Sequence, residues 1–520
     1  MATIPESPGV YITESLTPLT NNNIPGEAIG VIAAAYNQGP DVPTMVTSWN
    51  QYVQKYGTFQ QASPNTSLHY AVYQFFNNGG SRLIVLAVPN TDAVTATLTL
   101  QDINTPADNV MTVSAISPGA WANSIYVAIT SAGNTGRFNV QIYSGGTSSS
   151  NLVENFIDLS INPADPRNVS KILNSPTYGS NYINVTVSIP GTYTAGINDP
   201  ALISATPLTG GSNGVTAPNL GTAIPLQLDK LQGTILNVNV PGLDNSTTLN
   251  TLISWAIGRG DVMFVIDGPP PSFPETSAQV VQNYLNLITG GTPINNSTYA
   301  ALYAPWIQII DPASSIPGAS VWVPPGGAVL GAWSATDNQV GVWQTAAGVR
   351  YGKIKLVNIE ALFTSSDLDT LNVNNINAIR FVPNYYPAIM GGRTLEQGYP
   401  DRYVAVRRML MKLEHDFTYL LQPALFEPND AQLWLQITQI LTNYLTQLMQ
   451  QGALGGTTPD TAFQVICDSS NNTPATAQAG IVNVAVAVAL LSPAEFILIN
   501  ISQFQNTGQT TITTSPTAGS

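Results

Sequence analysis

The feature that most constrains the fold is a regular alternation of apolar and helix-like stretches between residues 215 and 312. The apolar stretches lie at 235–240, 262–266 and 307–310, and the helix-like stretches at 248–257 and 274–287. Because each helix can carry the chain back to the starting edge of a sheet, this alternation favours parallel strands with helical crossovers. The turns at the strand ends contain Pro241-Gly242 and Asp267-Gly-Pro-Pro-Pro. Proline has no amide N–H for a phosphate, so we predict a scaffold.

The segments on either side of this sheet differ from it in composition. An apolar stretch at 28–36 and helix-like stretches at 48–57 and 68–76 make the opening α/β. Residues 90–205 are rich in Thr, Ser, Asn and Gly, with alternating segments at 126–129, 138–143 and 183–189, which predicts a β-rich insertion. We therefore expect a multidomain fold of α/β and all-β parts. Its predicted divisions are an amino-terminal arm at 1–20, inner α/β residues at 21–89, the outer β-rich insertion at 90–205, an α/β domain at 215–345, a carboxyl-terminal domain at 350–493, and a carboxyl-terminal strand and arm at 494–520.

Two helices are predicted within the carboxyl-terminal domain. The first spans residues 401–421, and the second begins after Asn429 or Asp430 and ends at Gln451, before Gly452. The second has one apolar face, formed by Trp434, Ile437, Leu441, Leu445 and Leu448. Its opposite face is polar and uncharged, which suits contact with another subunit or with another domain of the same chain. The apolar stretch at 481–491 predicts a buried strand.

Charge is scarce and unevenly distributed. Charged residues make up 9% of the chain, against about 25% in ordinary soluble domains. This suits a surface buried against copies of the chain, although uncharged polar loops would also explain it. Residues 350–412 hold nine of the sixteen Lys and Arg residues, and none follows them. This basic segment pairs either with acids of its own chain or with an acidic face of another subunit, and we choose Arg407, Arg408 and Lys412 as candidate charged contacts.

Several function classes are disfavoured by the sequence. The chain is acidic, with a net charge of −14, and has no basic stripe interleaved with aromatics, so we expect no nucleic-acid partner. The single Cys467 cannot form an intrachain disulfide, and no secretory leader or membrane-spanning run is recognisable, so we expect a soluble protein from a reducing compartment, without membrane contact. Residues 210–214 match the G-x-S-x-G string, but no strand precedes them and the two histidines are distant in sequence. We predict no catalytic, cofactor-binding or metal-binding residue.

Both ends of the chain are predicted to extend as arms. Pro5 and Pro8 cannot lie inside a helix or a central strand, whereas Val10, Tyr11 and Ile12 favour an extended strand. Near the other end, a strand that is apolar on both faces needs cover on both sides; its residues are Phe496, Ile497, Leu498, Ile499, Ile501 and Phe504. The sequence leaves open whether each arm pairs within its own chain or with another chain.

An ordered series of motifs in the second half of the chain has a specific resemblance. The series contains PWIQIIDP, VWVPPGGAVLGAWSATDNQVGVW, MGGRTL, YVAVRRML, FEPND, GALGG, FQVICD and PAEFILINISQF, and PGVYITE stands near the amino terminus. With these motifs the chain resembles the tail sheath protein family of contractile bacteriophages. The family's Arg-Thr-Leu and Arg-Arg motifs correspond to Arg393-Thr394-Leu395 and Arg407-Arg408. The motifs cover about 200 residues, and the β-rich insertion at 90–205 matches no family that we can name.

The resemblance implies a structural role and not an enzyme. Such a subunit forms hexameric rings that stack helically around an inner tail tube, and it contracts without nucleotide to drive the tube through the host envelope. The arms add strands to sheets of neighbouring subunits, so they are the expected intersubunit joints. The implied partners are copies of the chain, the tube protein, and the baseplate and tail terminator proteins, in a virion tail assembled in the host cytoplasm. The alternatives are the sheath of a non-viral injection apparatus, a non-contracting virion protein such as a tube or capsid component, and a hydrolase built on the 215–312 sheet.

Overall fold

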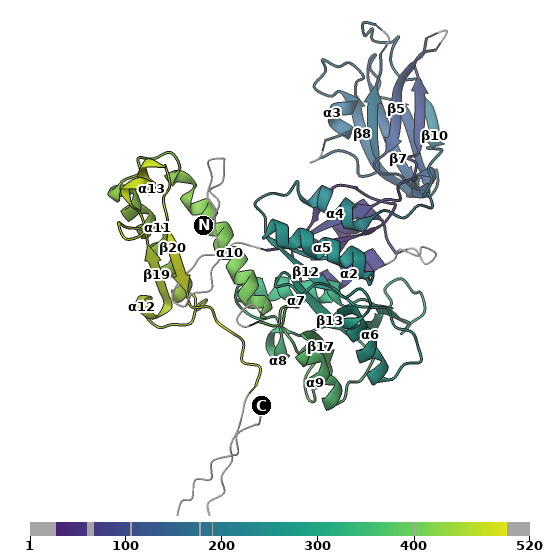
Figure 1. Cartoon of the computed structure of the whole chain (residues 1–520). Helices are drawn as coiled ribbons and strands as arrows, with labels where there is room; N and C mark the ends of the chain where they lie inside the picture. The colour runs from purple at the N-terminus through teal and green to yellow at the C-terminus, as the bar shows by residue number, and fades with distance from the viewer. Residues whose placement is uncertain are drawn as a thin grey trace, which may run out of the picture.

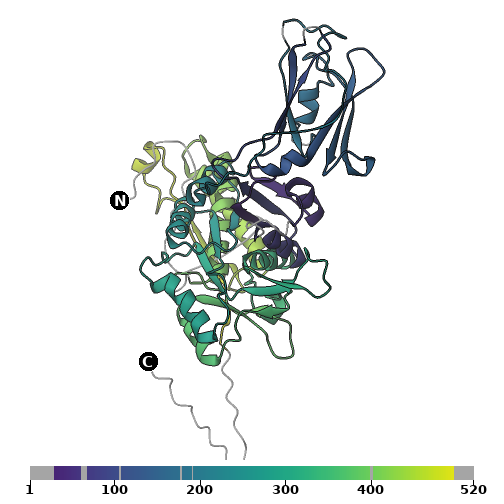
Figure 2. The same ribbon diagram turned by 90° about the vertical axis from the view of Figure 1, so that its right-hand side faces the viewer.

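The chain folds into a central α/β body, a β lobe and a carboxyl-terminal unit, which Figure 1 shows as separate masses. The computed structural model describes residues 28–59, 67–104, 107–175, 178–189, 191–398 and 402–496. Helix α10 (Val404–Leu421) runs from the body to the carboxyl-terminal unit. Figure 2, a view turned by 90°, shows the β lobe projecting beyond the body. The predicted multidomain mixture of α/β and β-rich parts is confirmed.

The body is built on one eight-stranded sheet, in the order β18-β17-β13-β12-β11-β1-β3-β2. The six central strands are parallel, whereas β2 and β18 pair antiparallel at the two edges. The strands are β1 (Ile29–Ala35), β2 (Thr44–Val46), β3 (Leu83–Val88), β11 (Leu236–Asn239), β12 (Val262–Ile266), β13 (Ala300–Ala304), β17 (Ile376–Arg380) and β18 (Ala388–Ile389). Strands from three domains that the sequence predicted to be separate thus share one sheet. This sheet continues across the predicted division near residue 350.

Helices cover both faces of this sheet and bury two apolar cores. One core involves α1 (Trp49–Tyr56), α2 (Ser67–Asn77) and α7 (Gly326–Gln339). The other involves α4 (Leu220–Leu228), α5 (Ser246–Arg259), α6 (Ser277–Thr289) and α9 (Ser365–Val373). A sheet covered on both faces requires strands that are apolar on both sides, and β3 and β12 are buried along their whole length. The short helix α8 (Gly348–Tyr351) lies beside β18.

Local capping chemistry sets the helix boundaries. Ser48 accepts a 3.2 Å hydrogen bond from the amide of Gln51, and Gly57 ends α1 with a φ of 79°. The predicted helix at 274–287 begins later, at Ser277, because Thr276 and Gln279 form a reciprocal capping box. The prediction that this helix starts at residue 274 was therefore wrong by three residues.

The stretch at 307–310 is a strand but lies outside the parallel sheet. As β14 (Ile307–Ile310), it pairs antiparallel with β15 (Ser320–Val323) and β16 (Asn358–Ile359) in a separate three-stranded sheet. The predicted place in the parallel sheet is taken by β13. Pro305 follows β13 directly and cannot donate to a sheet ladder, so the chain leaves the parallel sheet at this point.

The β lobe has two antiparallel sheets around a core of its own. One sheet has the order β4-β5-β9, and the other has the order β10-β6-β7-β8. Its elements are β4 (Thr97–Gln101), β5 (Asn109–Ala115), the 3-10 helix η1 (Ala120–Ser124), β6 (Ile125–Ser131), β7 (Phe138–Ser144), the 3-10 helix η2 (Ser149–Asn151), β8 (Leu152–Leu159), α3 (Val169–Leu173), β9 (Ile183–Val187) and β10 (Ile203–Pro207). Val94 and Ser212 bridge each other, so the chain enters and leaves the lobe side by side.

The carboxyl-terminal unit packs helices against a two-stranded sheet. Its elements after α10 are the 3-10 helix η3 (Gln422–Ala424), α11 (Ala431–Gln450), α12 (Pro459–Ala462), β19 (Phe463–Ile466), α13 (Pro474–Gln478) and β20 (Ala485–Val488). Asp430 caps α11, and the predicted apolar face of this helix lies in the core of the unit. The predicted buried strand at 481–491 was wrong in burial and length, because β20 has four residues and none of them is buried.

Candidate assembly site

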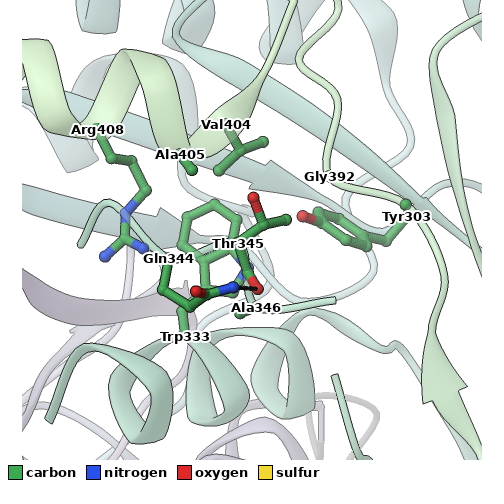
Figure 3. Close-up of a pocket in the computed structure, with 10 residues that line it drawn as sticks. Tyr303, Trp333, Gln344, Thr345, Ala346, Gly392, Val404, Ala405 and Arg408 are labelled. Atoms are coloured by element: carbon green, nitrogen blue, oxygen red, sulfur yellow. Dashed lines mark hydrogen bonds between the residues drawn. The ribbon is translucent and has the colours of Figure 1, made fainter. Parts of the chain in front are cut away.

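The first turns of α10 carry two arginines whose guanidinium groups contact the body. Arg408 donates to both carboxylate oxygens of Asp337 on α7, with an Nη1–Oδ1 distance of 3.1 Å. Its guanidinium carbon lies 4.7 Å from the ring centre of Trp333, and Figure 3 shows the two side chains together. The guanidinium of Arg407 lies 4.7 Å from the ring centre of Tyr299, just before β13. The two arginines therefore fasten α10 to the body.

Further along α10, a second group of charges reaches both the body and α11. Lys412 is fully buried and donates to Asp416, which also accepts a 2.5 Å hydrogen bond from the Tyr444 hydroxyl on α11. The ring of His415 has Nδ1 3.0 Å from a carboxylate oxygen of Asp416 and Nε2 2.8 Å from the carbonyl oxygen of Gly233. Because both neighbours are acceptors, only the doubly protonated imidazole can donate to both.

The protonation states follow from this arrangement. The hydrogen bond to Asp416 is the main reason that the pKa of His415 lies above its ordinary value. Burial lowers the pKa of Lys412, against the attraction of Asp416. Burial would raise the pKa of Asp416, but the hydrogen bond from His415 and the charge of Lys412 outweigh it, so this pKa lies below its ordinary value. We call the five residues Arg407, Arg408, Lys412, His415 and Asp416 the α10 charge cluster.

The Arg-Thr-Leu motif holds the end of the carboxyl-terminal unit against the body. Arg393 donates from Nε to Glu495 at 2.9 Å and from Nη2 to the other oxygen of the same carboxylate. Its Nη1 donates to the carbonyl oxygen of Asn372 at 2.7 Å. Thr394 and Leu395 are buried, and Leu395 packs in one of the two body cores. The bidentate Arg393–Glu495 pair thus holds the chain against the body directly before Phe496.

The β19–β20 sheet and the polar face of α11 are open in the single chain. Within the residues that the structure describes, neither β19 nor β20 pairs with a further strand. A two-stranded sheet is marginal by itself, because it buries little and leaves its edge amides without strand partners. On α11, the uncharged polar residues Gln436, Gln439, Asn443 and Gln447 are exposed. This face is therefore available for contact with another molecule, as one of the two predicted alternatives requires.

Besides a larger cavity of about 200 Å³ that Asp337 and Lys412 help to line, the junction of α10 with the body holds one very small cavity. Figure 3 shows the side chains around a cavity that Tyr303, Trp333, Thr345 and Val404 help to line. Its volume is about 10 Å³, which is at the lower limit for one water molecule. This cavity is therefore a packing defect and not a ligand site.

The residues considered for catalysis do not form a reactive arrangement in the structure. The Ser212 hydroxyl accepts a 3.2 Å hydrogen bond from the amide of Gly214, as in a glycine-rich turn. His69 is buried between the hydroxyls of Tyr36 and Tyr52, each 2.8 Å from a ring nitrogen, and burial lowers its pKa to about 4. Within the described ranges, no group of three or more His, Cys, Asp or Glu side chains is arranged to hold a metal ion. No described helix combines the length and apolarity needed to cross a membrane.

Comparison with known proteins identifies the carboxyl-terminal part of the chain. Residues 399–504 match the family model of the phage tail sheath C-terminal domain. This part of the chain is therefore similar to the phage tail sheath C-terminal domain. The resemblance inferred from the motifs is therefore confirmed, and the matched region contains the Arg407-Arg408 motif of the α10 charge cluster. A search of curated protein sequences finds no match to the chain.

Chains of solved baseplate and sheath structures have a similar fold over most of this chain. A chain from the baseplate of the anti-feeding prophage is 19% identical, with a TM-score of 0.56, and the match covers 96% of this chain and 100% of that one. A chain of the PVC sheath complex, an extracellular contractile injection system in the contracted state, is 21% identical, with a TM-score of 0.57 and coverages of 96% and 99%. A sheath tail protein from Listeria innocua is 13% identical, with a TM-score of 0.57 and coverages of 86% and 90%.

The three predicted charged contacts, which belong to the matched residues 399–504, lie inside the single chain. Arg407, Arg408 and Lys412 are at most 3% exposed, and each pairs with a carboxylate of the same chain. The structure thus realises the alternative in which the basic helix pairs with its own acids. An exchange of these pairs between copies of the chain would require them to open first, and it stays a prediction.

The predicted arms lie almost entirely outside the described residues. Among the amino-terminal residues these are Val10, Tyr11 and Ile12; among the carboxyl-terminal residues they are Ile497, Leu498, Ile499, Ile501 and Phe504. Phe496 is described, and its side chain is 72% exposed. This exposed phenylalanine, the last residue that the structure describes, fits the expectation that the segment needs cover, and its intersubunit pairing stays a prediction.

The sequence interpretation missed two contacts between the carboxyl-terminal part of the chain and the body. The bond between His415 and Gly233 joins residues 182 positions apart, and no local pattern predicts it. The partner of Arg393 was also missed, although Glu495 is the last charged residue of the chain and directly precedes the predicted arm strand. An isolated acid at the start of an apolar strand was a usable sign of an anchoring pair.

Proposed function

We propose that this chain is the sheath subunit of a contractile bacteriophage tail. Its subunits form hexameric rings that stack helically around an inner tube, and contraction of the sheath drives the tube through the host envelope. The observation that carries the proposal is the likeness to chains of two sheath structures over 96% of this chain, together with the match of residues 399–504 to the phage tail sheath C-terminal domain. The fold serves as a mechanical scaffold, so the subunit acts without a cofactor and not as an enzyme.

The open β19–β20 sheet supports the arm mechanism. Each of its edges offers unpaired backbone groups, so a strand from another chain can extend it by β-augmentation. On this proposal, the strands around Val10–Tyr11–Ile12 and around 496–504 of neighbouring subunits complete the sheet. Such an exchange is heterologous and does not close, which suits a helical assembly. The baseplate, tube and tail terminator proteins are the remaining partners.

A second candidate is the sheath of a non-viral contractile injection apparatus. Two of the similar structures, from the anti-feeding prophage and PVC systems, favour it. Both candidates use the same subunit mechanics and differ in whether the tail carries a genome-filled head. Electron microscopy of particles purified from the producing cells distinguishes them by the presence or absence of that head.

Electron microscopy of the purified protein tests the shared part of the proposal. We expect tubes with a hexameric, cogwheel-like end view, alone or on co-expression with a tube protein. A variant that lacks residues 1–15 should not form normal tubes, whereas removal of residues 510–520, beyond the predicted carboxyl-terminal strand, serves as a control. Monomers under all conditions, even with the tube protein, would refute the sheath assignment. Normal tubes from the variant without residues 1–15 would refute the arm mechanism alone.

A further inference from the structure

Two segments of the body form an exposed surface with basic and aromatic side chains. Residues 350–357 and 380–390 are joined by backbone hydrogen bonds, from the amide of Ile354 to Pro387 at 3.0 Å and from the amide of Ile389 to Gly352 at 2.8 Å. The exposed side chains on them include Arg350, Lys353, Lys355, Phe381, Tyr385 and Tyr386. We call these six residues the basic aromatic surface.

The cations of this surface have no carboxylate partner in the described chain. Arg350 lies 4.9 Å from the ring centre of Tyr351, and Lys353 lies 5.0 Å from that of Tyr386. Lys355 donates to an amide oxygen of Asn77 at 3.3 Å. Residues 348–359 and 376–395 contain no Asp or Glu. In contrast to the α10 charge cluster, these positive charges are exposed and not neutralised by an ion pair among the described residues.

The aromatic side chains are held on a short, defined hairpin. Strands β17 and β18 pair antiparallel at Ile379–Ile389 and Arg380–Ala388, and Asn384 turns the loop with a φ of 64°. Tyr385 and Tyr386 are 63% and 66% exposed. Tyrosine and arginine, two residue types of this surface, are enriched at protein interfaces.

The carboxyl-terminal unit offers the complementary chemistry. Residues 422–496 contain no Lys or Arg, so the exposed carboxylates of Glu427, Asp430 and Asp468 have no cation of their own segment beside them. In the same loop as Glu427, Phe426 is 88% exposed and has a φ of 66°, a strained conformation for a bulky residue. This loop thus presents an exposed phenylalanine next to exposed carboxylates, which complements the tyrosines and lysines of the basic aromatic surface.

We propose that the basic aromatic surface of one subunit docks on the 425–430 loop of a second copy. Charge complementarity selects this partner, because the surface has unpaired cations and the loop has Phe426 with Glu427 and Asp430. In Figure 1, α8 lies at the lower side of the body and α13, which contacts this loop through Asn429, lies at the top of the carboxyl-terminal unit. Different patches on one chain make a head-to-tail contact, which builds open assemblies. The inference rests on the proposed function and assigns it a charged contact other than the predicted α10 residues.

Charge exchange between the two patches tests this contact. The variant Lys353→Glu/Lys355→Glu should raise the protein concentration needed for tube formation on the order of tenfold, because two attractive pairs become repulsive. Glu427→Lys should also weaken assembly, and combining it with the lysine variant should restore assembly to near the wild-type concentration. Lys171→Glu/Lys230→Glu is the matched control, since it makes the same change in net charge at exposed lysines elsewhere. Pelleting and electron microscopy measure assembly, and salt titration should reduce the difference from wild type.

The outcomes separate this inference from the proposed function. If wild-type protein forms tubes and the Lys353→Glu/Lys355→Glu variant does so at the same concentration, the docking contact is wrong while the sheath proposal stands. Weakened assembly without rescue by Glu427→Lys also overturns the assigned partner. A fluorescent single-stranded oligonucleotide tests the competing class of partner. If wild-type protein binds it, the lysine variant does not, and assembly is unchanged, the surface binds nucleic acid and the proposal fails.

Discussion

Removing Arg408 should destabilise the isolated subunit strongly, because its partner would be left as a buried and unpaired carboxylate. The side chains of Arg408 and Asp337 are 2% and 12% exposed, and the pair is bidentate. Loss of one member of such a pair costs about 3–5 kcal/mol. We choose Arg408→Met, which keeps an unbranched stem against Trp333 and removes the charge. The expected loss of unfolding free energy in the dissociated subunit is therefore about 3–5 kcal/mol.

Two further measurements identify the cause of this loss. Adding Asp337→Asn to Arg408→Met should recover about half of it, because a buried amide without full hydrogen bonding costs only about 1–3 kcal/mol. Burial already raises the pKa of Asp337 above its ordinary value, and removal of Arg408 raises it further. At a pH below this raised pKa, the unpaired carboxyl is protonated and neutral, so its burial costs less free energy of unfolding. The destabilisation by Arg408→Met should thus increase as the pH rises above the folded-state pKa of Asp337 in the wild type, by up to about 1.4 kcal/mol per pH unit, and level off above the higher pKa of the variant.

Urea unfolding of unassembled subunits, followed by tryptophan fluorescence, measures these differences. The reasoning is refuted if Arg408→Met unfolds within about 1 kcal/mol of the wild type. If the same variant then fails to form tubes, Arg408 acts between subunits, as the sequence interpretation predicted. A loss of stability that Asp337→Asn does not reduce would show that the cost comes from packing against Trp333 and not from the unpaired charge.

Three other predictions concern separate parts of the chain. The pKa of His415 is raised above its ordinary 6.5, so its hydrogen bonds to Asp416 and Gly233 should stabilise the fold below pH 6.5 and lose this contribution as the pH rises through the raised value. The unfolding free energy of wild type and His415→Gln across pH 5–9 measures this difference. Gly327→Ala should lower the free energy of unfolding by about 2 kcal/mol or more, because a Cβ there would lie 2.3 Å from the carbonyl oxygen of Ala71 on α2. Gly291→Ala is the control and should leave thermal unfolding unchanged, because a Cβ there would meet nothing within 4 Å. Cys467 should react with a thiol reagent at pH 8 at least tenfold more slowly than an unfolded control, because burial raises its pKa to about 11; an equal rate would contradict this burial.

The sequence predicted elements well where the information is local. The helix at 48–57 was bounded correctly by Ser48 and Gly57, because a cap depends on residues within a few positions. The order of the central sheet was not predictable in this way. Strand β3 is followed in the chain by the whole β lobe, and β1 pairs with β11 over more than 200 residues. A pattern of apolar residues indicates that a strand is buried but not which strand lies beside it.

The positions of the basic residues show how the sequence separates buried cations from exposed ones. Arg407 and Arg408 lie in the run VAVRRMLMKL, where apolar neighbours on every side place most positions in a core. Lys353 and Lys355 lie in KIKL, and the alternation with the buried Ile354 directs both lysines outward. A count of basic residues treated the two groups alike. The apolar context of each charge, and not the number of charges, distinguishes a buried pair from an exposed contact.

The distribution of strong and open contacts locates where a sheath of such subunits could change shape. The α10 charge cluster and the Arg393–Glu495 pair tie the carboxyl-terminal unit to the body by buried or partly buried charges, so opening this junction would leave several of them unpaired. The β19–β20 sheet has open edges in the described chain. On the proposed function, contraction therefore moves subunits as nearly rigid pieces. The movement then occurs at the exposed contacts between subunits, while strands added to β19–β20 keep neighbouring subunits connected.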